Sequence, residues 1–245
     1  MSEQVVLVTG ASRGIGAATA RLFADKGFAV GINYREQSDA AEALVAQIAS
    51  SGGSAVALQA DVANEAEVSA MFETLDAELG TLSVLVNNAG IVGPRCRVTE
   101  LDVDVLRRML DINVVGSVLC AQHAIARMST QRGGHGGAIV NVSSGSAYIG
   151  NPGNGVHYAI TKGALNSFNI GASQEMVSEG VRINNVAPGM TTTDMTSDYG
   201  SEVFERLPMG RAAEPEEIAE AIYWLATESA SYVAGANIRV GGGRP

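Results

Sequence analysis

The chain has 245 residues, of which 46% are apolar, and its formal net charge is −10. This composition supports a sizeable core, and α/β folds of this length often form one domain. The acidic balance argues against a nucleic-acid partner, which requires clustered Lys and Arg, so an anionic ligand needs its own local basic residues.

Short apolar runs alternate with longer stretches of helical period. The runs that we expect to be strands are residues 4–9, 29–33, 55–61, 83–87, 138–143, 182–187 and 237–240. They lack regular apolar–polar alternation, as is typical of parallel strands covered on both faces. The repeated strand–helix–strand order predicts an α/β fold, in which a doubly wound, seven-stranded parallel sheet lies between two helical layers. No Pro- or Ser-rich linker divides the chain, so residues 1–245 are expected to form a single domain.

Two segments between the strands carry patterns that begin helices. Asp39 with Glu42, and Asn64 with Glu67, resemble capping boxes, in which a side chain and a glutamate three residues later satisfy free backbone N–H groups. We therefore expect the second and third helices to begin at these residues.

A glycine-rich segment follows the first expected strand and opens a helix. Glycines at such a turn let the backbone approach a pyrophosphate, which then lies at the positive end of the helix. An ordinary strand-to-helix turn is the competing interpretation, but the strand before and the helix after both favour a dinucleotide site. The residues expected to bind the cofactor here are Gly10, Ser12, Arg13, Gly14, Ile15 and Gly16.

The spacing of this turn is Gly-x-x-x-Gly-x-Gly, and with it the sequence resembles the single-domain branch of the short-chain dehydrogenase/reductase family. Further motifs of that family follow in order along nearly the whole chain: Asp61-Val62, Asn87-Asn88-Ala89-Gly90, Asn113, Asn141-Val142-Ser143-Ser144, Tyr158-Ala159-Ile160-Thr161-Lys162 and Pro188-Gly189. The resemblance implies a Rossmann-type, three-layer α/β/α fold and an oxidoreductase that uses a nicotinamide cofactor.

The resemblance also implies cofactor contacts by position. Asp61 would accept a hydrogen bond from the adenine amino group, with Val62 beside the ring. The residues implied under the adenosine are Asn88, Ala89 and Gly90, and those implied around the nicotinamide and its phosphate are Pro188, Gly189, Thr191 and Thr193.

The end of the second expected strand indicates which dinucleotide is used. A carboxylate there would bind both ribose hydroxyls of NAD, but this strand runs into Arg35. Arg35, with Arg13 as a second clamp, favours the 2′-phosphate of NADP(H), because guanidinium groups bind phosphate well. Glu36 is a competing signal, since a small shift in register would bring an acid near the ribose, so NAD(H) stays an alternative.

Tyr158 and Lys162 are four residues apart in a segment that is expected to be helical from about residue 156, so they share one face. A free phenol has a pKa of about 10, and a nearby ammonium favours the phenolate, so we expect Lys162 to lower the pKa of Tyr158. Tyr158 would then exchange a proton with the carbonyl or alcohol oxygen. By resemblance, Lys162 would also contact the nicotinamide ribose.

Ser144 and Asn113 complete the catalytic set. Ser144 ends the fifth expected strand and would hydrogen-bond the reacting oxygen, with Ser143 or Ser146 as alternatives. Asn113 matches the family residue that binds a water in a proton relay. His157 adjoins Tyr158 but faces another side of the helix, so we expect a substrate-pocket or surface residue.

Residues 190–214 lack a strong helical pattern and are expected to form a mobile lid over the site. An apolar wall is expected from Met195, Tyr199, Phe204 and Leu207. Arg95 and Arg97 follow the Asn-Asn-Ala-Gly motif, and they suggest the hypothesis of an anionic substrate.

The interpretation we favour is an NADP(H)-dependent enzyme that moves a hydride between the nicotinamide and a carbonyl or secondary alcohol. Its similar relatives include 3-oxoacyl reductases, sugar dehydrogenases and steroid dehydrogenases. A non-catalytic dinucleotide sensor is the alternative from another class, but such proteins typically lose the tyrosine or the lysine. A sugar-nucleotide epimerase requires a longer chain and another glycine spacing.

Assembly and location complete the expectations. The family commonly forms homotetramers through its long helices, and apolar residues are available at Val114, Val115, Val118 and Leu119. Cys96 and Cys120 lack metal or redox spacing, so we expect reduced thiols and no metal. The first residues do not resemble a signal peptide, and no uninterrupted apolar run approaches the roughly 20 residues of a membrane span. We therefore expect a cytoplasmic protein.

Overall fold

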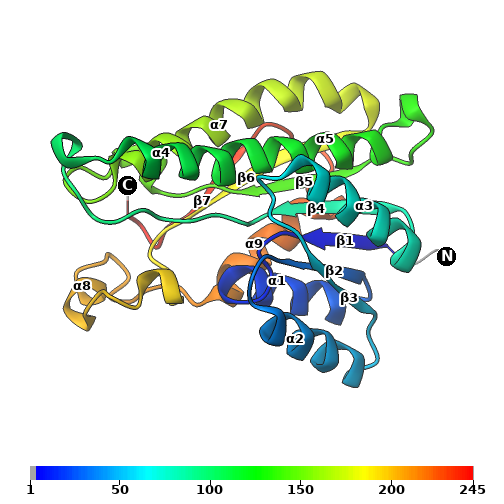
Figure 1. Ribbon diagram of the computed structural model, residues 1–245, viewed down its shortest axis with the longest axis horizontal. Helices are drawn as coiled ribbons and strands as arrows, with labels where there is room; N and C mark the ends of the chain where they lie inside the picture. Colours follow the sequence, from blue (N-terminus) through cyan, green and yellow to red (C-terminus); the bar gives the residue numbers. More distant parts are fainter. Residues whose placement is uncertain (1–3, 245) are drawn as a thin grey trace.

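The computed structural model describes residues 4–244, so Met1, Ser2 and Glu3, on which the signal-peptide expectation partly depends, lie outside the described residues. Seven parallel strands form one sheet in the order β3-β2-β1-β4-β5-β6-β7 (Figure 1). The strands are β1 (Val5–Val8), β2 (Ala29–Tyr34), β3 (Ala55–Gln59), β4 (Leu82–Asn87), β5 (Gly137–Val142), β6 (Val181–Pro188) and β7 (Asn237–Val240). All seven expected strands are confirmed, and the strand order reverses its direction between β1 and β4, where open α/β sheets bind ligands.

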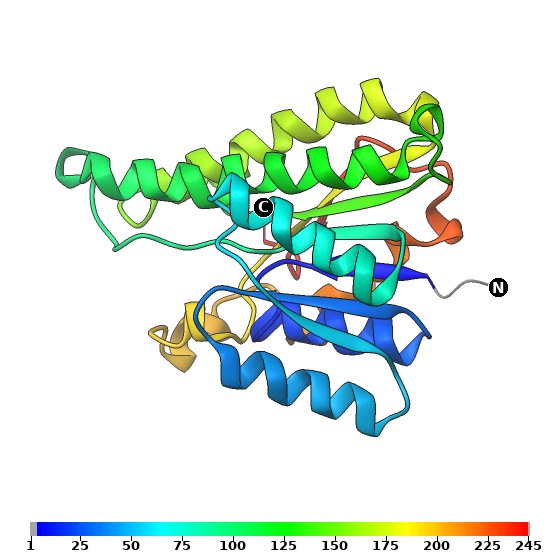
Figure 2. The same ribbon diagram turned by 45° about the vertical axis from the view of Figure 1, so that its right-hand side comes forward.

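Helices cover both faces of the sheet (Figures 1 and 2). One face carries α1 (Gly14–Asp25), α2 (Ser38–Ser50) and α9 (Pro215–Ala226). The other face carries α3 (Glu65–Leu79), α4 (Val103–Leu110), α5 (Gly116–Met128) and α7 (Val156–Met176). The expected three-layer α/β/α architecture is therefore confirmed.

Strand β1 shows why its sequence lacks apolar–polar alternation. Val6 and Val8 are buried in the core beneath α1, with Phe23, whereas Val5 and Leu7 are buried in the core on the opposite face. Successive side chains of a strand point to opposite faces, so a strand covered on both sides must be apolar throughout.

Four asparagines cross the interior of the sheet on adjacent strands. Asn87 donates to Asn141 at 2.9 Å, Asn141 to Asn185 at 2.9 Å, and Asn185 to Asn237 at 2.7 Å. Each pair occupies directly opposed positions of neighbouring strands. This row, the asparagine ladder, pairs most of its buried amide groups, whereas Asn87 Oδ1 has no partner among the described residues.

The expected helix start at Asn64 is confirmed, but without the reciprocal bond of a capping box, because Glu67 accepts from the Asp61 backbone and the Asn64 side chain. The Asn64 side chain accepts from the backbone N–H groups of Ala66 and Glu67 at the start of α3. The Asp39 pattern is wrong, because α2 begins at Ser38 and Asp39 already lies within its first turn. There its charge stabilises the positive end of the helix without acting as a cap.

One long helical segment on the second face is apolar enough to be compared with a membrane span. Residues Val103–Met128 form a continuous helix, interrupted only by a π-helical turn at Asp111–Val115. It is long and apolar enough to cross a membrane by length and composition, with a mean hydropathy of 1.3, and 44% of that window is buried. A core helix of a folded domain has the same properties, so the expectation of no membrane partner stays a prediction.

The lid segment, residues 190–214, is closed at its base. Thr192 donates its backbone N–H to Ala213 at 2.8 Å, and Ala213 donates to Met190 at 2.9 Å. Between these bonds lie two short helical turns, Asp194–Thr196 and α8 (Ser201–Glu205). The segment is thus more regular than the sequence pattern predicts, although both turns are too short to show a helical period.

Candidate active site

A groove of about 550 Å³, the strand-end groove, lies beyond the carboxyl ends of β1 to β4. It is bounded by the glycine-rich turn, the segments that follow β2, β3 and β4, and part of the lid segment. The residues of the expected cofactor set that line it are Gly10, Ser12, Arg13, Gly14, Ile15, Arg35, Asp61, Val62, Asn88, Ala89, Gly90 and Thr193. Most of the expected cofactor residues therefore meet in one groove.

The glycine-rich turn requires glycine for two reasons. Gly10 has φ +60°, and a Cβ there would lie 2.9 Å from the Cα atom of Ala89. A Cβ on Gly16 would lie 2.5 Å from the Asn88 amide nitrogen, so that glycine lets the turn pack against the segment after β4. Among the described residues, no side chain caps α1 and its first turn has no acid. The free N–H groups there fit an anionic pyrophosphate.

Asn33 positions this turn, and sequence reasoning missed it. Its Oδ1 accepts the backbone N–H of Gly10 at 3.1 Å, while its Nδ2 donates to the carbonyl oxygens of Leu58 and Ala60 at 3.2 and 3.1 Å. The side chain is buried and ties the turn to β2 and to the end of β3. An amide within an apolar strand was the available signal.

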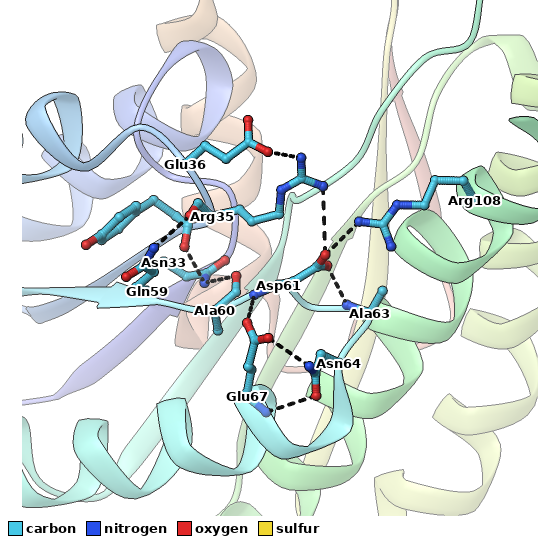
Figure 3. A network of polar contacts seen from close by, with 11 residues as sticks. Asn33, Arg35, Glu36, Gln59, Ala60, Asp61, Ala63, Asn64, Glu67 and Arg108 are labelled. Atoms are coloured by element: carbon cyan, nitrogen blue, oxygen red, sulfur yellow. Dashed lines mark hydrogen bonds and ion pairs between the residues drawn. The ribbon is translucent and has the colours of Figure 1, made fainter.

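Four charged residues, Arg35, Glu36, Asp61 and Arg108, form a network that we call the charged rim (Figure 3). Arg35 pairs with Glu36, and its Nη1 lies 3.8 Å from Asp61 Oδ2. Arg108 donates to the same Asp61 oxygen at 2.6 Å. Burial acts to raise the pKa of Asp61, but the hydrogen bonds from Arg108 and Ala63, with the two guanidinium charges, hold it below its ordinary value. Asp61 is therefore an ionised acceptor at neutral pH.

Arg13, the second expected phosphate clamp, pairs with the lid segment. Its guanidinium lies 3.1 Å from the Asp194 carboxylate, and both side chains are largely exposed. Arg13 and Asp194 both line the strand-end groove, so the ion pair crosses from the glycine-rich turn to the lid segment beside that groove.

The tyrosine end, which comprises Ser144, Tyr158 and Lys162, adjoins Gly90. A Cβ on Gly90 would lie 3.5 Å from the Lys162 Nζ atom, which donates to the carbonyl oxygen of Val142 at 2.8 Å. The same Nζ lies 5.7 Å from the centre of the Tyr158 ring. Both side chains come from the first turns of α7. Neither is among the residues that line the strand-end groove, and Gly90, which does line it, is the residue that separates Lys162 from the groove.

The expectation that Lys162 gives Tyr158 a lowered pKa is wrong. Burial raises the pKa of Tyr158 to about 12, although the hydrogen bond with Ser144 acts in the opposite direction. Burial also lowers the pKa of Lys162 to about 8. Desolvation disfavours both charged forms and sets the direction of both pKa shifts. Tyr158 is therefore a protonated phenol at neutral pH.

The choice between Ser143 and Ser144 follows from their hydrogen bonds. Ser143 is buried, and its hydroxyl donates to Asn166 at 2.8 Å and to the Lys162 carbonyl at 3.3 Å, so it faces α7. Ser144 instead meets the Tyr158 phenol and accepts the backbone N–H of Ser146 at 3.1 Å. The geometry favours Ser144 for orienting a reacting oxygen.

Asn113 lies in the π-helical turn and is fully buried. Its Oδ1 accepts from the Ile91 backbone at 2.8 Å, and its Nδ2 donates to Ile91 and to Thr161 Oγ1 at 2.9 and 3.0 Å. The side chain therefore fastens the segment after β4 to α7. A π-turn at this point is in keeping with the frequent use of such turns at functional sites.

Pro188, Gly189 and Thr191 lie where β6 ends, outside the residues that line the strand-end groove. Pro188 accepts the Gly145 backbone N–H at 2.8 Å, which joins this end to the segment after β5. A Cβ on Gly189 would lie 2.8 Å from Gly241, so this position also requires glycine. Thr191 is buried and donates to the Gly189 carbonyl at 3.3 Å.

Tyr199 of the lid segment is held from two sides. The Arg95 guanidinium lies 4.0 Å from the ring centre, and the Asn154 amide donates to the phenol oxygen at 3.1 Å. His157 is buried rather than at the surface, because the chain at Gly93 packs directly against its Nε2 atom. The segment after β4 thus reaches both the lid segment and the start of α7.

Comparison with known proteins places this geometry among oxidoreductases. The family model described as enoyl-(acyl carrier protein) reductase matches residues 10–244. The chain is 43% identical to an uncharacterized oxidoreductase of Escherichia coli (strain K12), over 98% of this chain and 99% of that protein. It is 39% identical to a Synechocystis 3-oxoacyl-[acyl-carrier-protein] reductase, over 99% and 97%. A short-chain dehydrogenase of Burkholderia cenocepacia solved with NADP superposes with a TM-score of 0.90, 31% identity and coverage of 99% and 98%.

Proposed function

Because the chain belongs to the short-chain dehydrogenase/reductase family of oxidoreductases, we propose that it is a single-domain, NADP(H)-dependent enzyme that interconverts a carbonyl and its secondary alcohol. When bound, a nicotinamide supplies or accepts the hydride. The proposal is carried by one observation, the side-by-side position of Tyr158 and Lys162 behind Gly90, which lines the strand-end groove.

The protonation states support carbonyl reduction at neutral pH. With a pKa of about 12, Tyr158 carries a proton that it can donate to a carbonyl oxygen. Ser144 orients that oxygen through its hydroxyl. Lys162, with a pKa of about 8, is mostly an ammonium at pH 7, and its charge stabilises the phenolate left after proton donation.

The cofactor preference rests on the charges that line the strand-end groove. Arg13 and Arg35 are available to a 2′-phosphate, and the Burkholderia cenocepacia relative was solved with NADP. Glu36, the signal that favoured NAD(H), is engaged by Arg35 and is therefore less available to ribose hydroxyls. NAD(H) use is the alternative, which a direct comparison of the two nucleotides decides.

A panel of carbonyl compounds, followed by the loss of NADPH absorbance, tests the proposal, with Tyr158→Phe as the diagnostic variant. We expect wild-type turnover of at least one compound and a loss in kcat of about 10²- to 10⁴-fold in the variant. The affinity for NADPH should stay within about twofold, because a single neutral hydroxyl is removed.

A sensor gives a different result, because it binds nucleotide but turns over no compound of the panel. Full activity of Tyr158→Phe contradicts the role of the phenol.

We also propose a homotetramer in the cytoplasm. Apolar side chains on the outer surfaces of the π-helical turn before α5 and of α7 support it, since Val115, Ile160 and Ile170 are about half exposed. Light scattering tests the assembly, and the mass of a monomer in solution contradicts it.

A further inference from the structure

Arg108 is part of the charged rim, although it is not among the site residues expected from the sequence. It lies near the end of α4, and its guanidinium reaches Asp61, 47 residues earlier in the chain. The Arg108 side chain is 42% exposed, whereas that of Asp61 is 20% exposed, so the bond fixes a partly buried carboxylate. Figure 3 shows Arg108 and Arg35 approaching Asp61 from different sides.

The two arginines face the same carboxylate oxygen. Arg108 Nη2 lies 2.6 Å from Asp61 Oδ2, while Arg35 Nη1 lies 3.8 Å from it. Arg35 also pairs with Glu36 on its other side. Because opposite charges attract more strongly at shorter range, Arg108 is the main partner of Asp61. Arg35 is thereby left with Glu36 as its one close carboxylate within the charged rim.

The charge balance depends on Arg108. Glu36 and Asp61 contribute two negative charges, which Arg35 and Arg108 offset. Glu67, which accepts the Asp61 backbone N–H at 2.8 Å, adds a third carboxylate close by. Without Arg108, the Arg35 guanidinium alone would offset both Glu36 and Asp61. The uncompensated Asp61 carboxylate would then repel a phosphate that approached Arg35. It would also compete more strongly with that phosphate for the Arg35 guanidinium.

We propose that Arg108 is a specificity-determining residue for the phosphorylated dinucleotide. It holds Asp61 Oδ2, so that Asp61 competes less with a 2′-phosphate for Arg35. Ribose hydroxyls carry no charge, so the same arrangement has little effect on NADH. This inference rests on the proposed preference for NADP(H).

The test measures dissociation constants of NADPH and NADH for the full-length protein by fluorescence titration. In Arg108→Met we expect the Kd of NADPH to rise about three- to fivefold, the range that a half-exposed ion pair supports. The Kd of NADH should change by less than about twofold. Arg107→Met is the matched control, since Arg107 is the neighbouring arginine of α4 and pairs with Asp104 at 2.8 Å in an exposed position.

Asp61 variants separate this role from a loss of folding or of general binding. In an Asp61→Asn background the competing charge is absent, so adding Arg108→Met should leave the ratio of the two dissociation constants unchanged. Arg108→Lys keeps the charge and should retain most of the wild-type ratio. Thermal unfolding midpoints near that of the wild type show that the variants fold.

Three results overturn the inference. They are an unchanged ratio in Arg108→Met, an equal loss of both nucleotides, and the same loss in the Asp61→Asn background. Wild-type protein that binds NADPH no more tightly than NADH refutes the proposed cofactor preference itself, and the inference fails with it.

Discussion

The charged rim and the tyrosine end hold their charges in opposite ways. On the rim, Arg35 is 46% exposed and shares its surroundings with carboxylates. At the tyrosine end, Lys162 is 4% exposed, and its ammonium donates to a backbone carbonyl. Water and counter-charges keep the rim groups ionised, whereas burial sets the protonation of the tyrosine end. Under the proposed function, the choice of nucleotide is therefore a competition among ion pairs, whereas proton transfer depends on desolvation.

The magnitudes support this difference. The pKa of Lys162 falls from 10.5 to about 8, which corresponds to roughly 3 kcal/mol. An exposed ion pair typically contributes about 0.2–1 kcal/mol. Changes at the tyrosine end should thus exceed changes at the rim severalfold.

The largest effect is expected from Lys162→Met, through the pH dependence of stability. Below about pH 8, Lys162 is protonated in both the folded and the unfolded wild type, and its burial costs up to about 3 kcal/mol. Between pH 8 and 10.5, the folded protein releases the proton while the unfolded chain still binds it, so wild-type stability rises. The methionine variant should lack this rise.

Urea unfolding between pH 7 and 10.5 checks this prediction. Loss of the hydrogen bond to Val142 also lowers the free energy of unfolding of the variant, but by an amount that does not depend on pH. Parallel curves for the two proteins would break the comparison, because they would mean that Lys162 is not desolvated.

A smaller effect is expected from Arg35→Asp. A carboxylate at this position repels a 2′-phosphate and can accept from ribose hydroxyls, so the ratio of NADPH to NADH affinity should fall about tenfold. Fluorescence titration with both nucleotides measures it, and Arg35→Lys is the charge-preserving control. An unchanged ratio would show that this arginine does not read the phosphate.

The smallest effect is expected from Asp194→Asn. Its carboxylate pairs with Arg13 beside the strand-end groove and competes with any phosphate there. Its removal should tighten NADPH binding about two- to threefold at low salt, and the gain should vanish near about 1 M salt. Asp198→Asn is the matched control, since Asp198 is exposed and makes no ion pair within residues 4–244. A gain that persists at high salt would indicate a cause other than charge.

Local sequence patterns predict the sheet and most of the strand-end groove. Apolar runs fix the strands, and the glycine spacing and the Tyr158–Lys162 interval depend on short-range geometry. Arg108 could not be found this way, because its partner is 47 residues away and exposed arginines are common. The prediction of a lowered pKa for Tyr158 is wrong for a related reason. The spacing of four residues indicates that Lys162 is near, but the tertiary fold sets how deeply both side chains are buried.

The asparagine ladder constrains how the parallel sheet can assemble. If one of β4 to β7 paired with its neighbour one residue out of step, its amide would turn to the opposite face, and the partner amides would lose their bonds inside an apolar layer. Each orphaned amide would cost about 1–3 kcal/mol, so misaligned intermediates are less stable than the native alignment. Parallel sheets assemble slowly, because their contacts join distant parts of the chain. The four amides thus favour the native alignment of β4 to β7 over misaligned pairings during folding.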